Sequence, residues 1–256
     1  MSAAGSQGSG AEGQPRMYGE FAHLWPLFSA PEDYAEEARY WRQALRDRLG
    51  PGRHPILELG VGGGNNLSHL TAEFAATAVD RSARMLAQCS QLNPGVPVHL
   101  GDMRTVRLGQ RFRAVLIHDA VSYLQTEDDL RQAFATAVAH LEPGGVLIVA
   151  PDDYCETFHS PRVSHGTNSD GETEVTSFEY QYDPDPSDTT TETVMVYLIR
   201  RGREVRVEED HHRMGLFPRQ RWLDLMAEAG FSVESLPYPV HEDGREAWLL
   251  VGVLER

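Results

Sequence analysis

Apolar residues recur along the chain in more than one rhythm, and the first rhythm predicts a helix. Over residues 31–49 the apolar positions return at spacings of three and four, which is the period of one face of an α-helix. Pro31 stands where the first turn is expected, and Gly50 follows the last apolar position. These two residue types commonly mark the beginning and the end of a helix, so we predict an amphipathic helix over 31–49.

From residue 55 onward, short apolar runs alternate with helical patterns. We predict strands at 55–59, 75–80, 96–102, 112–120 and 144–151, and helices at 65–74, 82–92 and 126–141. Strands that alternate with helices form βαβ units and a parallel, doubly wound sheet. Ligands of such sheets bind at the carboxyl ends of the strands.

The rhythm changes after Pro151. Residues 152–171 are polar and are expected to be irregular. Three following segments alternate polar and apolar residues, which predicts antiparallel strands at 172–183, 189–202 and 203–217. A helix at 218–231 and strands at 231–238 and 246–256 are then expected to complete the parallel core.

These patterns predict four parts. Residues 1–16 are rich in Gly, Ser and Ala and are expected to be disordered. Residues 17–152 hold N-terminal helices and a cofactor-binding core, 153–216 form a β insertion over the acceptor, and 217–256 complete the core.

The charge balance bears on possible partners. The chain carries 38 Asp and Glu against 23 Lys and Arg, a formal net charge of −15. A phosphate backbone needs a cationic surface, so we expect a small-molecule partner and no nucleic acid. No apolar run reaches the ~20 residues that span a bilayer, and residues 1–16 lack the apolar segment of a secretory signal. We therefore expect a cytoplasmic protein without membrane contact.

The stretch ILELGVGGGNNL raises the question of a nucleotide cofactor. Glu58 lies near the end of the first predicted strand, and Gly60, Gly62 and Gly64 follow before a helix. Glycines at such a turn permit positive φ angles and close approach of a ligand to the backbone. A dinucleotide turn has a third glycine where this chain has Asn65. On the turn alone, a purely structural role is the alternative.

Two further acids lie in register with this turn. Asp80 ends the second strand, where a carboxylate can bind both hydroxyls of a ribose. Asp102 ends the third strand, where a carboxylate can accept a hydrogen bond from an exocyclic amine such as that of adenine. Each acid alone is more often a turn or helix cap, but their combination with the glycine turn favours a nucleoside site.

Five stretches in order resemble the successive motifs of class I S-adenosylmethionine-dependent methyltransferases: ELGVGGGNNL, AVDRSARML, GDMRTVRL, FRAVLIHDAVSYL and LEPGGVLIVAPDDY. The resemblance extends from about residue 55 to 152. It implies a Rossmann-like, seven-stranded, mostly parallel sheet with an antiparallel last strand, here with an antiparallel β insertion after the fifth strand. It also implies S-adenosylmethionine as the cofactor.

The resemblance assigns cofactor-binding roles residue by residue. Tyr18 and Trp25 are expected to belong to an N-terminal lid that covers the cofactor and excludes water, with simple packing of the helix as the alternative. The resemblance implies that Arg81 stands beside Asp80 at the ribose and that Met103 joins Asp102 at the adenine. It places the methionine part and the sulfonium near Glu58, Gly60, Gly62, Gly64 and His118.

Other stretches, including MYGEF, DYAEEA, SYL and GLF, are similar to the bacterial sugar N-methyltransferases of deoxyamino-sugar biosynthesis. Those natural-product enzymes dimethylate an amino group on a nucleotide-linked hexose, which implies an amino sugar as the acceptor. Trp25-Pro26 departs from the Tyr-Asp pair of that subfamily. O-methylation of a sugar or of another natural-product hydroxyl therefore stays open.

An amine acceptor has to lose a proton, and a hydroxyl acceptor usually needs a general base. His118 follows the fourth strand and is our candidate base, and Asp119 is the candidate to orient that histidine or a substrate amine. A histidine that only packs against the adenosine or caps a turn is the alternative.

The remaining candidates concern the acceptor. Strand alternation places one of His211 and His212 toward the site and the other toward solvent. We expect no metal, because the histidines lack Glu or Cys partners at ligand spacing, and the insertion could pair with a second subunit to form a homodimer. The predicted acceptor contacts are Trp25, Tyr123, Asp152, Asp153, His159 and His211.

Two other classes of protein stay open on the sequence. An NAD-dependent oxidoreductase is disfavoured by Asn65 in the third glycine position and by the presence of Asp102. A non-catalytic binding protein that retains the fold is the other alternative.

Overall fold

The computed structural model describes residues 14–241 and 244–255, and its larger sheet has seven strands in the order β10-β11-β5-β4-β1-β2-β3. β11 is antiparallel to both of its neighbours, and the other pairs are parallel. This arrangement confirms the Rossmann-like sheet predicted from the sequence. The strands are β1 (Pro55–Leu59), β2 (Ala75–Asp80), β3 (Val98–Leu100), β4 (Phe112–Ile117), β5 (Leu141–Val149), β10 (Phe231–Pro237) and β11 (Trp248–Leu254).

Helices cover both faces of this sheet, as buried parallel strands require. Ile56 and Leu116 pack with Trp41 on one face, whereas Leu57 and Ile117 pack with the face that holds Trp222. The first face is covered by α2 (Ala35–Leu49), α3 (Asn65–Ser68) and α4 (Ala83–Leu92), and the second by α5 (Glu127–His140) and α6 (Arg219–Glu228).

Most predicted helices are present, but one is much shorter than expected. The 31–49 segment forms the 3-10 helix η3 (Pro31–Tyr34) followed by α2. The helix predicted over 65–74 was wrong beyond Ser68, where α3 ends. Leu70 N–H donates to the carbonyl of Leu67, a tight i to i+3 bond, and Thr71 Oγ1 donates to the carbonyl of Ser68. Side-chain bonds of this kind compete with a regular helix.

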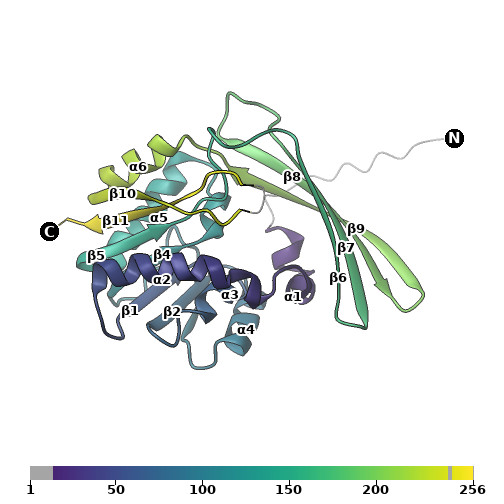
Figure 1. Ribbon diagram of the computed structural model, residues 1–256, viewed down its shortest axis with the longest axis horizontal. Coiled ribbons are helices and arrows are strands. Elements are labelled where there is room, and N and C mark those ends of the chain that lie inside the picture. Colours follow the sequence, from purple (N-terminus) through teal and green to yellow (C-terminus); the bar gives the residue numbers. More distant parts are fainter. Residues whose placement is uncertain (1–13, 242–243, 256) are drawn as a thin grey trace.

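The insertion forms a separate four-stranded antiparallel sheet, which stands beside the core in Figure 1. Its strands are β6 (Arg162–Ser169), β7 (Thr173–Tyr182), β8 (Thr190–Arg201) and β9 (Glu204–Gly215). The prediction that 152–171 is irregular was therefore wrong over β6. This edge strand pairs with β7 over its whole length, and its outward positions are mostly polar, so its sequence shows no apolar alternation.

The two faces of this sheet have an unusual polarity. The face toward the core carries the polar side chains of Gln181, Thr193, Asp210 and His212, which are all buried. The opposite face exposes large apolar side chains, namely Val163, Phe178, Tyr180, Leu198, Val205 and Val207. The homodimer expected from the sequence stays a prediction.

The N-terminal segment lies between the core and the small sheet (Figure 1). It consists of η1 (Arg16–Tyr18), η2 (Ala22–Leu24) and α1 (Trp25–Phe28). The expected disorder of 1–16 was wrong at Arg16, which begins η1 and bonds to β9; residues 1–13 lie outside the described residues. Among the helices that the structure describes, none is long and apolar enough to cross a membrane.

Candidate active site

A cavity of about 760 Å³ opens at the carboxyl ends of β1, β2, β4 and β5. The core supplies its floor, the N-terminal segment contributes Tyr18 and Trp25, and β9 contributes Arg213 and Met214 at the rim. This is the edge of a doubly wound sheet at which ligands bind. The predicted residues that line the cavity are Tyr18, Trp25, Glu58, Gly60, Gly62, Asp80, Arg81, Asp102, Met103, His118, Asp119, Tyr123, Asp152 and His211.

The glycine turn is built for close packing. Gly60 has φ 77° and Gly62 has φ 55°, in the left-handed region that favours glycine. A Cβ added to Gly60 would lie 2.3 Å from Cβ of Ala120. Gly64 was predicted to bind the cofactor, but it does not line the cavity. It precedes α3 and packs against Cys89.

Several buried polar atoms around the cavity have no hydrogen-bond partner among the residues that the structure describes. They are Oε2 of Glu58, the indole Nε1 of Trp25 and both side-chain amide atoms of Asn66. Such unpaired groups are costly unless a ligand or water satisfies them. Sequence reasoning missed Asn66, although its place at the start of the helix after the glycine turn is a usable signal. These atoms indicate a cavity shaped for a polar ligand.

Burial also affects the charges of the cavity. It raises the pKa of Glu58 to about 7, and it raises the pKa of Asp80 above its ordinary value despite the hydrogen bonds that Asp80 accepts. Asp80 accepts from the backbone N–H of Gly62 at 2.8 Å and of Ser82 at 2.7 Å. A cationic ligand such as a sulfonium fits this set, because a positive charge stabilises the ionised form of both acids.

Asp102, predicted to contact the adenine, is paired within the protein. Arg104 bonds to both of its carboxylate oxygens, at 3.0 and 2.7 Å, and also bonds to Asp129 at 2.7 Å. These bonds lower the pKa of Asp102. Arg104 lines the cavity and was not predicted from the sequence.

His118 is held on both of its ring nitrogens. Nε2 lies 2.7 Å from Oε2 of Glu37, and Nδ1 lies 2.6 Å from Oδ1 of Asp119. Burial opposes a charge on the ring, but the two carboxylates outweigh it and raise the pKa of His118 well above its ordinary value. The base role predicted for His118 is untested, and this double pairing argues against it, because an imidazolium cannot accept a proton.

A second cavity of about 290 Å³ adjoins the first. It lies between the core and the inner face of the small sheet, and it shares Tyr18, Trp25, Tyr123 and Asp152 with the first cavity. Asp152 follows β5 at the junction of the two spaces. Burial, followed by the nearby Asp119 and Asp153 carboxylates, raises the pKa of Asp152 well above its ordinary value.

The polar lining of the second cavity comes from several elements. Asp153 forms a bidentate pair with Arg162, at 2.9 and 2.5 Å, and the Arg162 guanidinium also donates to Oε1 of Gln181. Arg245 reaches the same carboxylate at 3.8 Å. Arg162, Gln181 and Arg245 were not predicted, because only the folded insertion brings them beside Asp153.

Two predicted acceptor contacts are placed less favourably. His159 is exposed and lines neither cavity. The side chain of His211 is 64% exposed at the rim and pairs with Glu209, whereas its neighbour His212 is buried and faces the second cavity. Strand alternation predicts that one of these two histidines faces the core, but it cannot tell which one unless the inward face of β9 is already known.

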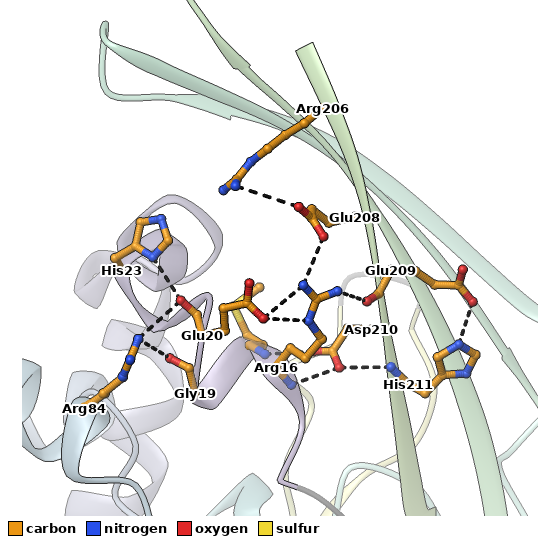
Figure 2. Close-up of polar contacts among 11 residues, drawn as sticks. Arg16, Gly19, Glu20, His23, Arg84, Arg206, Glu208, Glu209, Asp210 and His211 are labelled. Atoms are coloured by element: carbon orange, nitrogen blue, oxygen red, sulfur yellow. Dashed lines mark hydrogen bonds and ion pairs between the residues drawn. The ribbon is translucent and has the colours of Figure 1, made fainter. Parts of the chain in front are cut away.

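Arg16 connects the N-terminal segment to the insertion (Figure 2). Its guanidinium bonds to Glu20, Glu208 and the carbonyl of Glu209. The hydroxyl of Ser82, at the start of α4, donates to the carbonyl of Tyr18. The segment that carries Tyr18 and Trp25 is therefore anchored on both sides of the cavity, in agreement with the predicted N-terminal cover, whose function stays untested.

Fold and site together define a Rossmann-like protein with a large cavity at the carboxyl ends of its strands and a smaller cavity beside the insertion. A family profile described as a methyltransferase domain matches residues 56–145. The chain is 32% identical over 223 residues to the dTDP-3-amino-3,6-dideoxy-alpha-D-glucopyranose N,N-dimethyltransferase of Streptomyces fradiae, and this match covers 86% of each protein. The chain also matches the dTDP-3-amino-3,4,6-trideoxy-alpha-D-glucopyranose N,N-dimethyltransferase of Streptomyces venezuelae, and this match spans 62% of the length of that relative.

Solved structures agree with this likeness. DesVI of Streptomyces venezuelae superposes with a TM-score of 0.81 at 31% identity, covering 91% of this chain and 98% of DesVI. The S-adenosylmethionine-bound amino pentose methyltransferase CalS10 of Micromonospora echinaspora superposes with a TM-score of 0.73 at 26% identity, covering 96% and 99%. The chain belongs to the S-adenosylmethionine-dependent sugar N-methyltransferase family.

Proposed function

We propose that the protein transfers methyl groups from S-adenosylmethionine to the amino group of a nucleotide-linked deoxyamino sugar. The observation that carries the acceptor class is the second cavity, with Asp152 where it joins the cofactor cavity. A carboxylate there suits an ammonium group, which would neutralise the repulsion between Asp152 and its acidic neighbours Asp119 and Asp153. The names of the matched relatives, which include sugar N,N-dimethyltransferases, support the same class.

The first cavity is proposed to hold the cofactor. Asp80 is assigned to the ribose hydroxyls, and Glu58, Asn66 and Trp25 offer unpaired polar atoms to the rest of the molecule. When bound, the cofactor supplies an electrophilic methyl group on a sulfonium. Asp102 remains assigned to the adenine, together with Arg104, which holds its carboxylate in place.

In the reaction, the protein mainly positions the acceptor and keeps water out. Asp152 is proposed to hold the amine at the junction of the cavities, and the Asp153–Arg162 pair is proposed to contact the sugar from the insertion. Tyr18 and Trp25 close the junction from the N-terminal side. Fixing the two reactants in line can lower the barrier by roughly 7–11 kcal/mol.

Paired acceptors test this proposal. The protein is incubated with S-adenosylmethionine and a dTDP-linked 3-amino-3,6-dideoxyhexose, or with the matching sugar that has a hydroxyl at the same carbon. Mass spectrometry should show methyl addition to the amino sugar and none to the hydroxyl sugar. Methylation of the hydroxyl sugar alone would refute the amine assignment.

Two substitutions then separate the sites. Asp152→Asn should raise KM for the amine more than tenfold and leave cofactor affinity within about twofold, because it removes one charge-assisted contact. Asp80→Asn should instead weaken cofactor affinity in calorimetry by 10-fold or more, since hydrogen bonds to charged groups contribute about 1.5–3 kcal/mol. An unchanged cofactor affinity in the Asp80 variant would contradict the ribose assignment.

A further inference from the structure

A chain of hydrogen-bonded side chains leads from the cavities into β9. The hydroxyls of Tyr18 and Tyr123 lie 3.0 Å apart, and the Tyr123 hydroxyl lies 2.7 Å from Nδ1 of His212. Nε2 of His212 lies 3.1 Å from Oδ2 of Asp210. Both tyrosines line both cavities, and Asp210 is 3% exposed. The chain joins the junction of the cavities to a buried carboxylate.

The partners fix which nitrogen of His212 carries its hydrogen. An ionised carboxylate only accepts, so Nε2 donates to Asp210. In the neutral ring Nδ1 is then the acceptor, and the Tyr123 hydroxyl donates to it. Asp210 is itself held in place, because it accepts from the backbone N–H of Arg16 at 2.9 Å and of Met17 at 2.7 Å.

We propose that His212 is the proton acceptor of the reaction and that Tyr123 relays the proton to it. This inference rests on the proposed function. The ammonium form of the acceptor gives a proton to the Tyr123 oxygen as Tyr123 gives its own hydroxyl proton to Nδ1 of His212. The freed nitrogen lone pair then forms the N–C bond while the S–C bond of the sulfonium breaks and its electron pair stays on sulfur.

The resulting imidazolium is paired with Asp210 and returns its proton to solvent through the cavities. The methylated ammonium loses a further proton by the same route before any second transfer. His212 thus differs from His118, whose two nitrogens both bond to carboxylates. Of these two histidines, His212 is the one that turns an accepting nitrogen toward a phenol that lines the cavities.

The titratable groups around His212 come from several elements. Tyr18 and Tyr123 face its ring from the N-terminal segment and from η4 (Asp119–Tyr123), and Asp210 lies on its own strand. The second cavity adds Asp152, Asp153, Arg162, Glu179 and Arg245. A positive charge formed on His212 therefore lies among more carboxylates than guanidinium groups.

The test compares His212→Asn with His165→Asn, a matched change at an exposed position of β6 in the same sheet. kcat/KM for the amino sugar is measured at saturating cofactor from about pH 5.5 to 9.5, a range that brackets the ordinary pKa values of free imidazole and of an α-amino group. His212→Asn should lose about 10²–10⁴-fold near pH 7, the usual contribution of a general base. This deficit should shrink as pH rises, because the amine then arrives deprotonated, and His165→Asn should match the wild type.

Two more variants test the relay as a unit. Tyr123→Phe should show the same pH-dependent deficit, and the double variant Tyr123→Phe/His212→Asn should be no worse than the poorer single variant. If His212→Asn does not fold, as judged by circular dichroism and cofactor affinity, Asp210→Asn replaces it, with the same expected profile. A deficit of equal size at every pH, or no deficit, would overturn the relay. Absence of amine methylation by the wild type would overturn both the relay and the proposed function.

Discussion

Oε2 of Glu37 lies 2.7 Å from Nε2 of His118, although the two residues are 81 positions apart in the sequence. The same carboxylate oxygen accepts from the hydroxyl of Tyr238 at 2.9 Å. With Asp119 on the other ring nitrogen, the pair makes His118 a buried, stabilised cation beside the cofactor cavity. Its expected role is therefore to position the cavity wall.

We predict that Glu37→Gln destabilises the protein most at acidic pH. The folded-state pKa of His118 is raised, so its stabilisation is fully present below the unfolded pKa of about 6.5 and is lost as pH rises through the folded pKa. The loss should be about 1.5–3 kcal/mol near pH 6 and smaller near pH 9. Urea unfolding at both pH values measures it.

Glu36→Gln provides the control, because Glu36 is exposed and pairs only loosely with Arg39, at 3.7 Å. It should change the free energy of unfolding by less than about 0.5 kcal/mol at either pH. Equal effects of the two substitutions on the free energy of unfolding would show that the Glu37–His118 pair contributes no more stability than an exposed ion pair.

The sequence predicted the core sheet and the glycine turn well, because both depend on local patterns. Strand-end acids such as Asp80 follow from the order of strands. The predicted helix starts at residues 82 and 126 are confirmed, because the side chains of Ser82 and Thr126 accept from the backbone N–H groups of Met85 and Asp129. The pairing of Glu37 with His118 could not be predicted, since it arises only when α2 packs across the sheet. A local pattern carries no signal for such a contact.

The insertion was harder to read for a different reason. Strand alternation normally places apolar residues inward, but here the inward positions of β9 include Asp210 and His212, while Val205 and Val207 point outward and are exposed. The usual rule therefore gives no guidance on which of two adjacent histidines faces the site.

Glu58 is predicted to lower the stability of the ligand-free protein. Its folded pKa is raised to about 7, so stability is lost as pH rises from the unfolded value of about 4.3 through that folded value. Glu58→Gln removes this titration and should be on the order of 3–4 kcal/mol more stable than the wild type at pH 8. At pH 4 the two proteins should differ much less.

The same substitution should weaken cofactor binding at least 10-fold, because it removes a negative charge from a cavity proposed to hold a cation. Urea unfolding and calorimetry measure the two effects. A Glu58→Gln protein that binds the cofactor normally would show that the unpaired Oε2 has no part in the site.

Gly60 and Gly62 allow steric clash and backbone strain to be separated. Both have positive φ, so alanine at either position should cost about 1–2 kcal/mol. A Cβ at Gly62 has only Met85 Cε near it, at 3.9 Å, whereas a Cβ at Gly60 would overlap Ala120. Gly60→Ala should therefore lose a further ~1–3 kcal/mol in urea unfolding of the ligand-free protein. Equal losses would mean that the turn can shift away from Ala120.

Arg16 is predicted to affect function more than stability. Its ion pairs with Glu20 and Glu208 are partly exposed, so Arg16→Ala should cost no more than ~1 kcal/mol in unfolding free energy. The same change removes the guanidinium bonds from Arg16 to β9. The backbone N–H bonds of Arg16 and Met17 to Asp210 still tie the N-terminal segment to that strand, so the segment that carries Tyr18 at the cavity should be held less firmly. KM for S-adenosylmethionine should rise several-fold, by up to the roughly 5-fold that corresponds to ~1 kcal/mol.

Arg206→Ala is the matched control for this prediction. Arg206 reaches the same Glu208 carboxylate, at 3.7 Å, from within β9 (Figure 2). The Arg206→Ala substitution removes a comparable charge without changing a contact of the N-terminal segment, so KM for the cofactor should stay at the wild-type value. A rise in KM of the same size in both variants would assign the effect to the charge of the small sheet. A rise confined to Arg16→Ala would identify the anchored segment as the cover of the cofactor, because only that variant loses the bond to the Glu209 carbonyl.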